Sequence, residues 1–72
     1  MSKEACLRLG KRIRELRKKR GLSQEKLAVK AGITLRHFAR LESSSPPAVA
    51  FDTLDAIARA LDVSLPSLVT FS

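Results

Sequence analysis

The stretch from Ser23 to Glu42, SQEKLAVKAGITLRHFARLE, constrains the fold more than any other part of the chain. Apolar or small residues recur in it at three-to-four-residue spacing on both sides of one glycine, Gly32. These residues are Leu27, Ala28, Ala31, Ile33, Phe38 and Leu41. The spacing predicts two short amphipathic helices, and Gly32 can take the positive φ that a tight turn between them needs. Because such a pair cannot bury its apolar faces alone, the rest of the chain is expected to pack against it.

A longer amphipathic helix is expected before this stretch, from Lys3 to Arg20. The segment contains no proline, and its apolar stripe is formed by Cys6, Leu9, Ile13 and Leu16. Gly21 is expected to end this helix. Two good N-cap residues, Ser23 and Thr34, then precede the two short helices. Three helices are therefore predicted in the first 42 residues.

The remaining residues predict a loop and two further helices. Residues 43–50, SSSPPAVA, are expected to form the loop, since Pro46 and Pro47 lack amide hydrogens. A fourth helix follows with Phe51 entering the core, and its stripe consists of Leu54, Ile57, Ala58 and Leu61. Ser64 is expected to cap a short fifth helix that tolerates Pro66 in its first turn. The sequence thus predicts an all-α, compact five-helix fold, with residues 1–72 as a single domain.

Charge is divided unevenly along the chain. Residues 1–40 hold thirteen of the fourteen Lys and Arg residues against three acids, which gives this half about +10. Residues 41–72 hold one Arg and four acids, about −3. A basic half in so small a domain is the footprint expected for a polyanionic partner, nucleic acid first. The alternative is a solvated surface that keeps the protein soluble.

Little in the sequence supports catalysis. There is one histidine, one cysteine, no glycine-rich phosphate loop and no pair of His or Cys residues at metal-ligand spacing. No enzymatic activity, metal site or cofactor is therefore expected. The lone Cys6 fits a packing role in a reducing cytoplasm. Because the N-terminus is charged and no apolar run approaches about 18 residues, neither a secretory signal nor a membrane span is expected, and the protein is expected to be cytoplasmic and nucleoid-associated.

The spacing of five residues, Gln24, Ala28, Gly32, Phe38 and Leu41, resembles that of the lambda-repressor-like helix-turn-helix family, of the Cro/repressor or XRE type. The resemblance continues on both sides, in LGKRIRELRKKRGLSQEKLA, KAGIT and TLDAIARALDVSLPSLV. It implies a DNA-binding domain whose second and third helices form the helix-turn-helix. It also implies a sequence-specific regulator of transcription that binds double-stranded DNA, a repressor or an autoregulatory controller such as those of phages or restriction-modification systems.

By this resemblance, the helix from Thr34 to Glu42 is the recognition helix and enters the major groove. Base contacts are expected from Thr34, Leu35, Arg36, His37 and Arg40. Arg36 and Arg40 lie four residues apart, and an Arg fork matches the O6 and N7 atoms of guanine. Thr34 and Leu35 offer methyl groups to a thymine methyl. His37 either contacts base or phosphate or is a solvated surface histidine.

Phosphate contacts are expected on both sides of the recognition helix, from Ser23, Gln24, Lys26, Ser43 and Ser44. Gln24 matches the family position that contacts phosphate, although it could instead support the helix cap. Which other cations of the first two helices face DNA stays open. The loop after the recognition helix departs from the family, because it carries no charge and has Ser44 where glycine is usual. Contact between this loop and the DNA backbone is expected to be weaker, or to come only from residues 43–45.

Two further expectations concern packing and assembly. In the family an arginine pairs with the glutamate that closes the recognition helix, and both match here as Arg17 and Glu42, which predicts a structural ion pair. The apolar C-terminal residues, Val63, Leu65, Leu68, Val69 and Phe71, either complete the core of the monomer or form part of a homodimer interface. An alternative to the DNA-binding regulator is a protein-interaction module, such as an antitoxin-like subunit or an adaptor of the transcription machinery.

Overall fold

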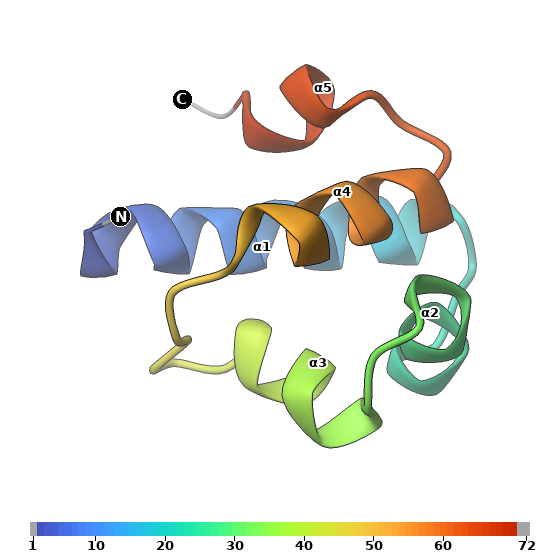
Figure 1. The fold of residues 1–72 in the computed structure, drawn as a ribbon, viewed down its shortest axis with the longest axis horizontal. Coiled ribbons are helices and arrows are strands. Elements are labelled where there is room, and N and C mark those ends of the chain that lie inside the picture. Colours follow the sequence, from blue (N-terminus) through green and yellow to red (C-terminus); the bar gives the residue numbers. More distant parts are fainter. Residues whose placement is uncertain (1, 71–72) are drawn as a thin grey trace.

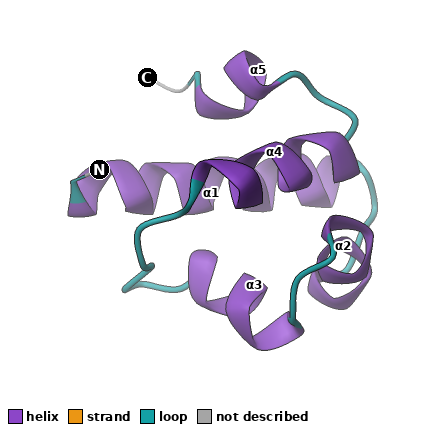
Figure 2. Ribbon diagram, in the orientation of Figure 1, coloured by secondary structure: helices purple, strands orange, loops and turns teal. Residues whose placement is uncertain are grey.

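The computed structural model describes residues 2–70, and in this part of the chain five α-helices form without any strand (Figure 1). Their bounds are Lys3–Lys19 for α1, Gln24–Ala31 for α2, Leu35–Leu41 for α3, Phe51–Ala60 for α4 and Leu65–Val69 for α5. Figure 2 shows short loops between the helices, with a longer one between α3 and α4. The all-α, five-helix prediction is confirmed, with the first helix ending one residue before Arg20.

Serine and threonine hydroxyls begin the helices at the predicted positions. The Lys26 N–H donates to Ser23 Oγ at 3.1 Å, the His37 N–H to Thr34 Oγ1 at 3.0 Å, and the Ser67 N–H to Ser64 Oγ at 3.2 Å. Such a cap typically stabilises a helix by about 1 kcal/mol. Gly32 ends α2 with φ of 72°, in the left-handed region where a side chain is disfavoured. The turn between α2 and α3 is thus fixed by residues within it.

One apolar core is shared by all five helices. It consists of Leu9, Ile13, Leu16, Leu27, Ala28, Phe38, Leu41, Leu54, Ile57, Ala58, Leu61 and Leu68. Helix α2 packs against α3 and α4, and α5 packs against α1 and α4. In Figure 1, α3 therefore lies at the opposite side of the molecule from α5. This arrangement buries the inner face of α3 and leaves its outer face free of other helices.

In the C-terminal half, the prediction for Phe51 is wrong, and the apolar residues at the C-terminus differ from one another in burial. Phe51 was expected to enter the core, but its side chain is 67% exposed. Its spacing continues the stripe of α4, yet it is the first residue of that helix, and the burial of the stripe begins only at Leu54. Leu68 is fully buried in the core, whereas Val69 is 41% exposed. Phe71, the last of these apolar residues, lies outside the described residues.

Within residues 2–70, no helix is long and apolar enough to cross a membrane.

A glycine inside α1 sets how closely α1 approaches α3. A Cβ atom at Gly10 would overlap the carbonyl oxygen of Leu41, the last residue of α3, and would lie 3.6 Å from the Cα of Glu42. Glycine within a helix is about 1 kcal/mol less favourable than alanine. Close backbone contact with the end of α3 explains why a helix as regular as α1 contains it at this position.

Candidate nucleic-acid interface

The outer face of α3 carries the side chains that the sequence assigned to base contact. Phe38 and Leu41 point into the core, with 0% and 1% exposure, and Thr34, Leu35, Arg36 and Arg40 lie exposed on the other side. His37 is half-buried. Within residues 2–70, the Arg36 and Arg40 guanidinium groups have no ion-pair partner. The face is therefore polar, cationic and able to donate hydrogen bonds outward.

Arg17 and Glu42 form a bidentate ion pair between α1 and the end of α3. Arg17 Nε donates to Glu42 Oε2 at 2.8 Å, and Arg17 Nη2 donates to Glu42 Oε1 at 3.0 Å. The third guanidinium nitrogen, Nη1, donates to the carbonyl oxygen of Leu22 at 2.8 Å. The two side chains are 11% and 3% exposed. Paired forks of this kind are geometrically specific, so the contact fixes both the distance and the orientation of α3 relative to α1.

Gln24 joins this ion pair. Its Nε2 donates to Glu42 Oε1 at 3.1 Å, which adds the first residue of α2 to the contact between α1 and α3. The sequence had left Gln24 either contacting phosphate or supporting the cap, and its bond to Glu42 is a role that neither alternative included. An amide nitrogen carries two hydrogens, so one remains for another acceptor. Because Gln24 and Glu42 lie 18 residues apart, no local spacing could have indicated the pairing.

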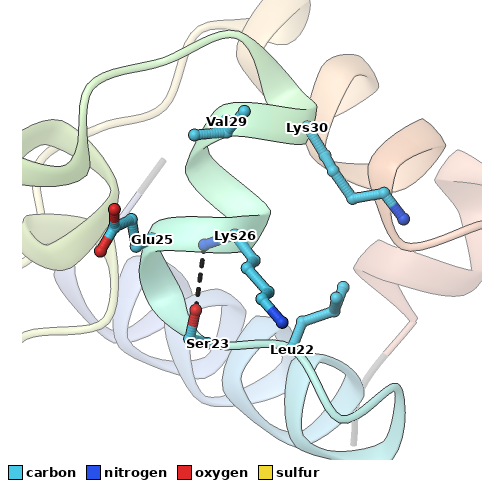
Figure 3. A pocket seen from close by; sticks show the side chains of 6 residues that line it. All are labelled: Leu22, Ser23, Glu25, Lys26, Val29 and Lys30. Atoms are coloured by element: carbon cyan, nitrogen blue, oxygen red, sulfur yellow. Dashed lines mark hydrogen bonds between the residues drawn. The ribbon is translucent and has the colours of Figure 1, made fainter.

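The other residues assigned to phosphate contact fall into two separate places. Ser43 and Ser44 follow α3, and Ser43 Oγ donates to the carbonyl oxygen of Arg40 at 2.7 Å. Lys26 lies instead beside a shallow hollow on the outer side of α2, together with Leu22, Ser23, Glu25, Val29 and Lys30. In Figure 3, the Lys26 and Lys30 side chains extend on one side of α2, and Glu25 on the other. Since residues two apart on a helix lie on nearly opposite sides, Lys26 is not grouped with Gln24.

Gly10 is the residue of this region that the sequence analysis missed. Its backbone contact with Leu41 determines where the end of α3, and therefore Glu42 and Ser43, lies. The available signal was an isolated glycine within a strong helical pattern, which often marks a close approach. In the part of the chain that the structure describes, no three His, Cys, Asp or Glu side chains lie close enough together to hold a metal ion.

Comparison with known proteins gives two findings that agree. A helix-turn-helix family model matches residues 13–68, which include α2, α3 and α4. The fold is similar to the crystal structure of the restriction-modification controller protein C.AhdI from Aeromonas hydrophila, with a TM-score of 0.82 and 33% sequence identity. That similarity covers 88% of this chain and 94% of the controller protein. No curated protein matches the chain significantly.

Proposed function

The chain belongs to the helix-turn-helix family, of the Cro/repressor-like type, and on this basis we propose that it is a sequence-specific regulator of transcription that inserts α3 into the major groove of double-stranded DNA. The observation that carries the proposal is the exposed face of α3, where Arg36 and Arg40 have no ion-pair partner among residues 2–70. The buried Phe38 and Leu41 hold the opposite face in the core. The similarity to a restriction-modification controller supports a repressor or autoregulatory controller within this class.

Sequence reading is assigned to two arginines and two methyl-bearing side chains. Arg36 and Arg40 are one helical turn apart, about 6 Å along the axis, so their forks reach bases about two base pairs apart. An arginine fork donates two parallel hydrogen bonds to guanine O6 and N7. Thr34 and Leu35, at the start of α3, present methyl groups that suit thymine. His37 contributes least in this proposal, because it is half-buried.

Contacts to the phosphates of the DNA backbone are assigned to the start of α2 and to the residues after α3. Gln24 keeps one amide hydrogen after its bond to Glu42, and the first backbone N–H groups of α2 add donors at the positive end of the helix. Ser23 precedes them, and Ser43 and Ser44 flank the other end of α3. Because Gln24 also donates to Glu42, a phosphate bound by Gln24 would be linked directly to the glutamate that positions α3. Lys26 extends from a different side of α2 and is therefore assigned to a phosphate farther along the DNA than the one that Gln24 contacts.

A homodimer is part of the proposal. Helix α3 has seven residues and reaches one half-site, whereas family members commonly bind two half-sites about 34 Å apart as a symmetric dimer. Among the C-terminal residues that the structure describes, Val69 of α5 is an exposed apolar side chain available for such an interface, whereas Leu68 beside it is buried in the core. No membrane, small-molecule or cofactor role is assigned.

Selection of bound sequences from random double-stranded oligonucleotides tests the function. We expect an enriched, two-fold symmetric sequence, with affinity that falls by about 0.9 log units per log unit of salt for each phosphate contacted. Arg36→Ala and Arg40→Ala should each cost about 1–3 kcal/mol on this sequence and relax the preference at one position. Arg59→Ala is the matched control, because it removes the same charge from α4, where Arg59 pairs with Asp55.

Two outcomes would contradict the proposal. An unchanged preference profile in both α3 variants would show that these arginines do not read bases. Binding that is independent of both sequence and salt would refute the regulator and favour the protein-interaction module instead.

A further inference from the structure

We propose that Lys11 and Arg14 of α1, together with Ser44, form a binding site for one backbone phosphate of DNA beside the end of α3. The inference rests on the proposed function, because it extends the same interface. It concerns the flank where the loop after α3 has no charged residue. In this proposal, α1 supplies the positive charge that the loop lacks.

The site is a hollow between α1 and the residues that follow α3. Its volume is about 430 Å³, and Lys11 and Arg14 line one wall while Ser43 and Ser44 line the other. Lys11 and Arg14 are three residues apart on α1, so both extend from the same side of that helix. The direct contact of Gly10 with Leu41 brings this side of α1 against the end of α3. A side chain at position 10 would separate the two walls.

Both cations of the hollow are free to bind an anion. Within residues 2–70, neither Lys11 nor Arg14 forms an ion pair, whereas Arg8 of the same helix bonds Glu4 at 2.8 Å. The acid in the hollow, Glu42, already accepts from Arg17 with both carboxylate oxygens, and its side chain is 3% exposed. The negative charge of Glu42 is therefore already compensated by Arg17, and the positive charges of Lys11 and Arg14 have no ion-pair partner in the described part of the chain.

Ser44 adds the hydrogen-bond donors that fix a phosphate in place. Among the described residues, neither its backbone N–H nor its hydroxyl donates a hydrogen bond, while the neighbouring Ser43 hydroxyl is used by Arg40. Backbone N–H groups and serine hydroxyls are common phosphate donors in protein–DNA interfaces. Ser44 lies two residues after Glu42, just beyond the end of α3. A phosphate bound here would therefore lie next to the groove that α3 enters.

If Lys11 and Arg14 only stabilised the fold, their removal would change different measurements than the loss of a phosphate contact would. Cations near the end of a helix interact favourably with its last carbonyl groups, and Lys11 and Arg14 lie near the end of α3. Such a role would lower thermal stability when the charges are removed. It would leave the salt dependence of DNA binding unchanged once the variant is folded.

The test compares Lys11→Gln/Arg14→Gln with Arg8→Gln/Arg59→Gln, which removes the same charge from two pairs outside the hollow. Affinity for the selected DNA is measured across a salt series, after thermal unfolding has shown that each protein is folded. We expect the slope of log affinity against log salt to become shallower by about 0.9 in the first variant than in the second, the value for one phosphate. DNA with single methylphosphonate substitutions then locates that phosphate. One substitution per half-site should weaken binding of the unmodified protein, and its effect on the Lys11→Gln/Arg14→Gln variant should be much smaller, because only the hydrogen bonds of Ser44 remain to be lost.

Equal slopes in the two variants would overturn the site, as would a loss of thermal stability with the slope unchanged. A methylphosphonate effect of the same size in both proteins would also overturn it. These results are distinct from failure of the proposed function, in which the unmodified protein itself would show no sequence preference and no salt dependence.

Discussion

Replacing Arg17 by alanine should destabilise the protein far more than replacing Arg14, although both are arginines of α1. Arg17 is buried and forms three hydrogen bonds, two to Glu42 and one to the carbonyl oxygen of Leu22. Arg14 is exposed and has no ion-pair partner in the described part of the chain. Alanine at position 17 leaves the Glu42 carboxylate, with 3% exposure, charged and without its cation.

The expected magnitude follows from that stranded charge. Removing one partner of a buried ion pair costs about 3–5 kcal/mol, whereas an exposed substitution usually changes stability by less than about 0.5 kcal/mol. A domain of this size has a total stability of roughly 4–11 kcal/mol. Because 1 kcal/mol corresponds to about 4–8 °C in a domain of 60–100 residues, Arg17→Ala should lower Tm by at least about 12 °C. Arg14→Ala should lower it by only a few degrees.

Thermal and urea unfolding followed by circular dichroism measures both variants under the same conditions. Arg17→Lys retains the charge but cannot form the bidentate contact, so its Tm should lie between those of the unmodified protein and Arg17→Ala. The double variant Arg17→Ala/Glu42→Ala should be more stable than the sum of the single losses indicates, because it leaves no unpaired charge. Equal Tm values for Arg17→Ala and Arg14→Ala would refute the reasoning, and so would strictly additive losses in the double variant.

Two further predictions concern packing and assembly. Gly10→Ala should lower the free energy of unfolding by about 1–3 kcal/mol in urea titrations, because the added methyl overlaps the Leu41 carbonyl, even though alanine is the better helix former. A variant more stable than the unmodified protein would show that α1 and α3 separate without cost. Val69→Asp should leave unfolding of the dilute protein within about 0.5 kcal/mol, since the side chain is exposed, but weaken the proposed dimer in sedimentation equilibrium. An unchanged dissociation constant would remove Val69 from the interface.

The helices and their ends could be predicted because they depend on nearby residues. Ser23 and Thr34 bond backbone groups three residues away, and Gly32 ends α2 through its own φ angle. The burial of Phe38 also followed from local periodicity. Local reasoning failed at Phe51, because spacing predicts which side of a helix a residue occupies and not where the covering helices end. Exposure at a helix terminus depends on the three-dimensional arrangement.

The contacts that position α3 could not be derived from spacing. Arg17 and Glu42 lie 25 residues apart, and their pairing was expected only because family relatives carry the same two residues. The bond from Gln24 to Glu42 and the contact of Gly10 with Leu41 were not expected at all. A glutamine at a helix start has several possible partners, and a glycine has no side chain to suggest one. The residues expected to read bases remain predictions from family position and chemistry.

The separation between the two sides of α3 has a consequence for how such a protein could acquire new targets. The side that holds the helix in place uses Phe38, Leu41 and Glu42, and the opposite side carries Leu35, Arg36 and Arg40. No residue of the second group contributes to the buried core. The outward positions are therefore free to vary at little risk to folding, so paralogues or designed variants could diverge in target choice while sharing one scaffold.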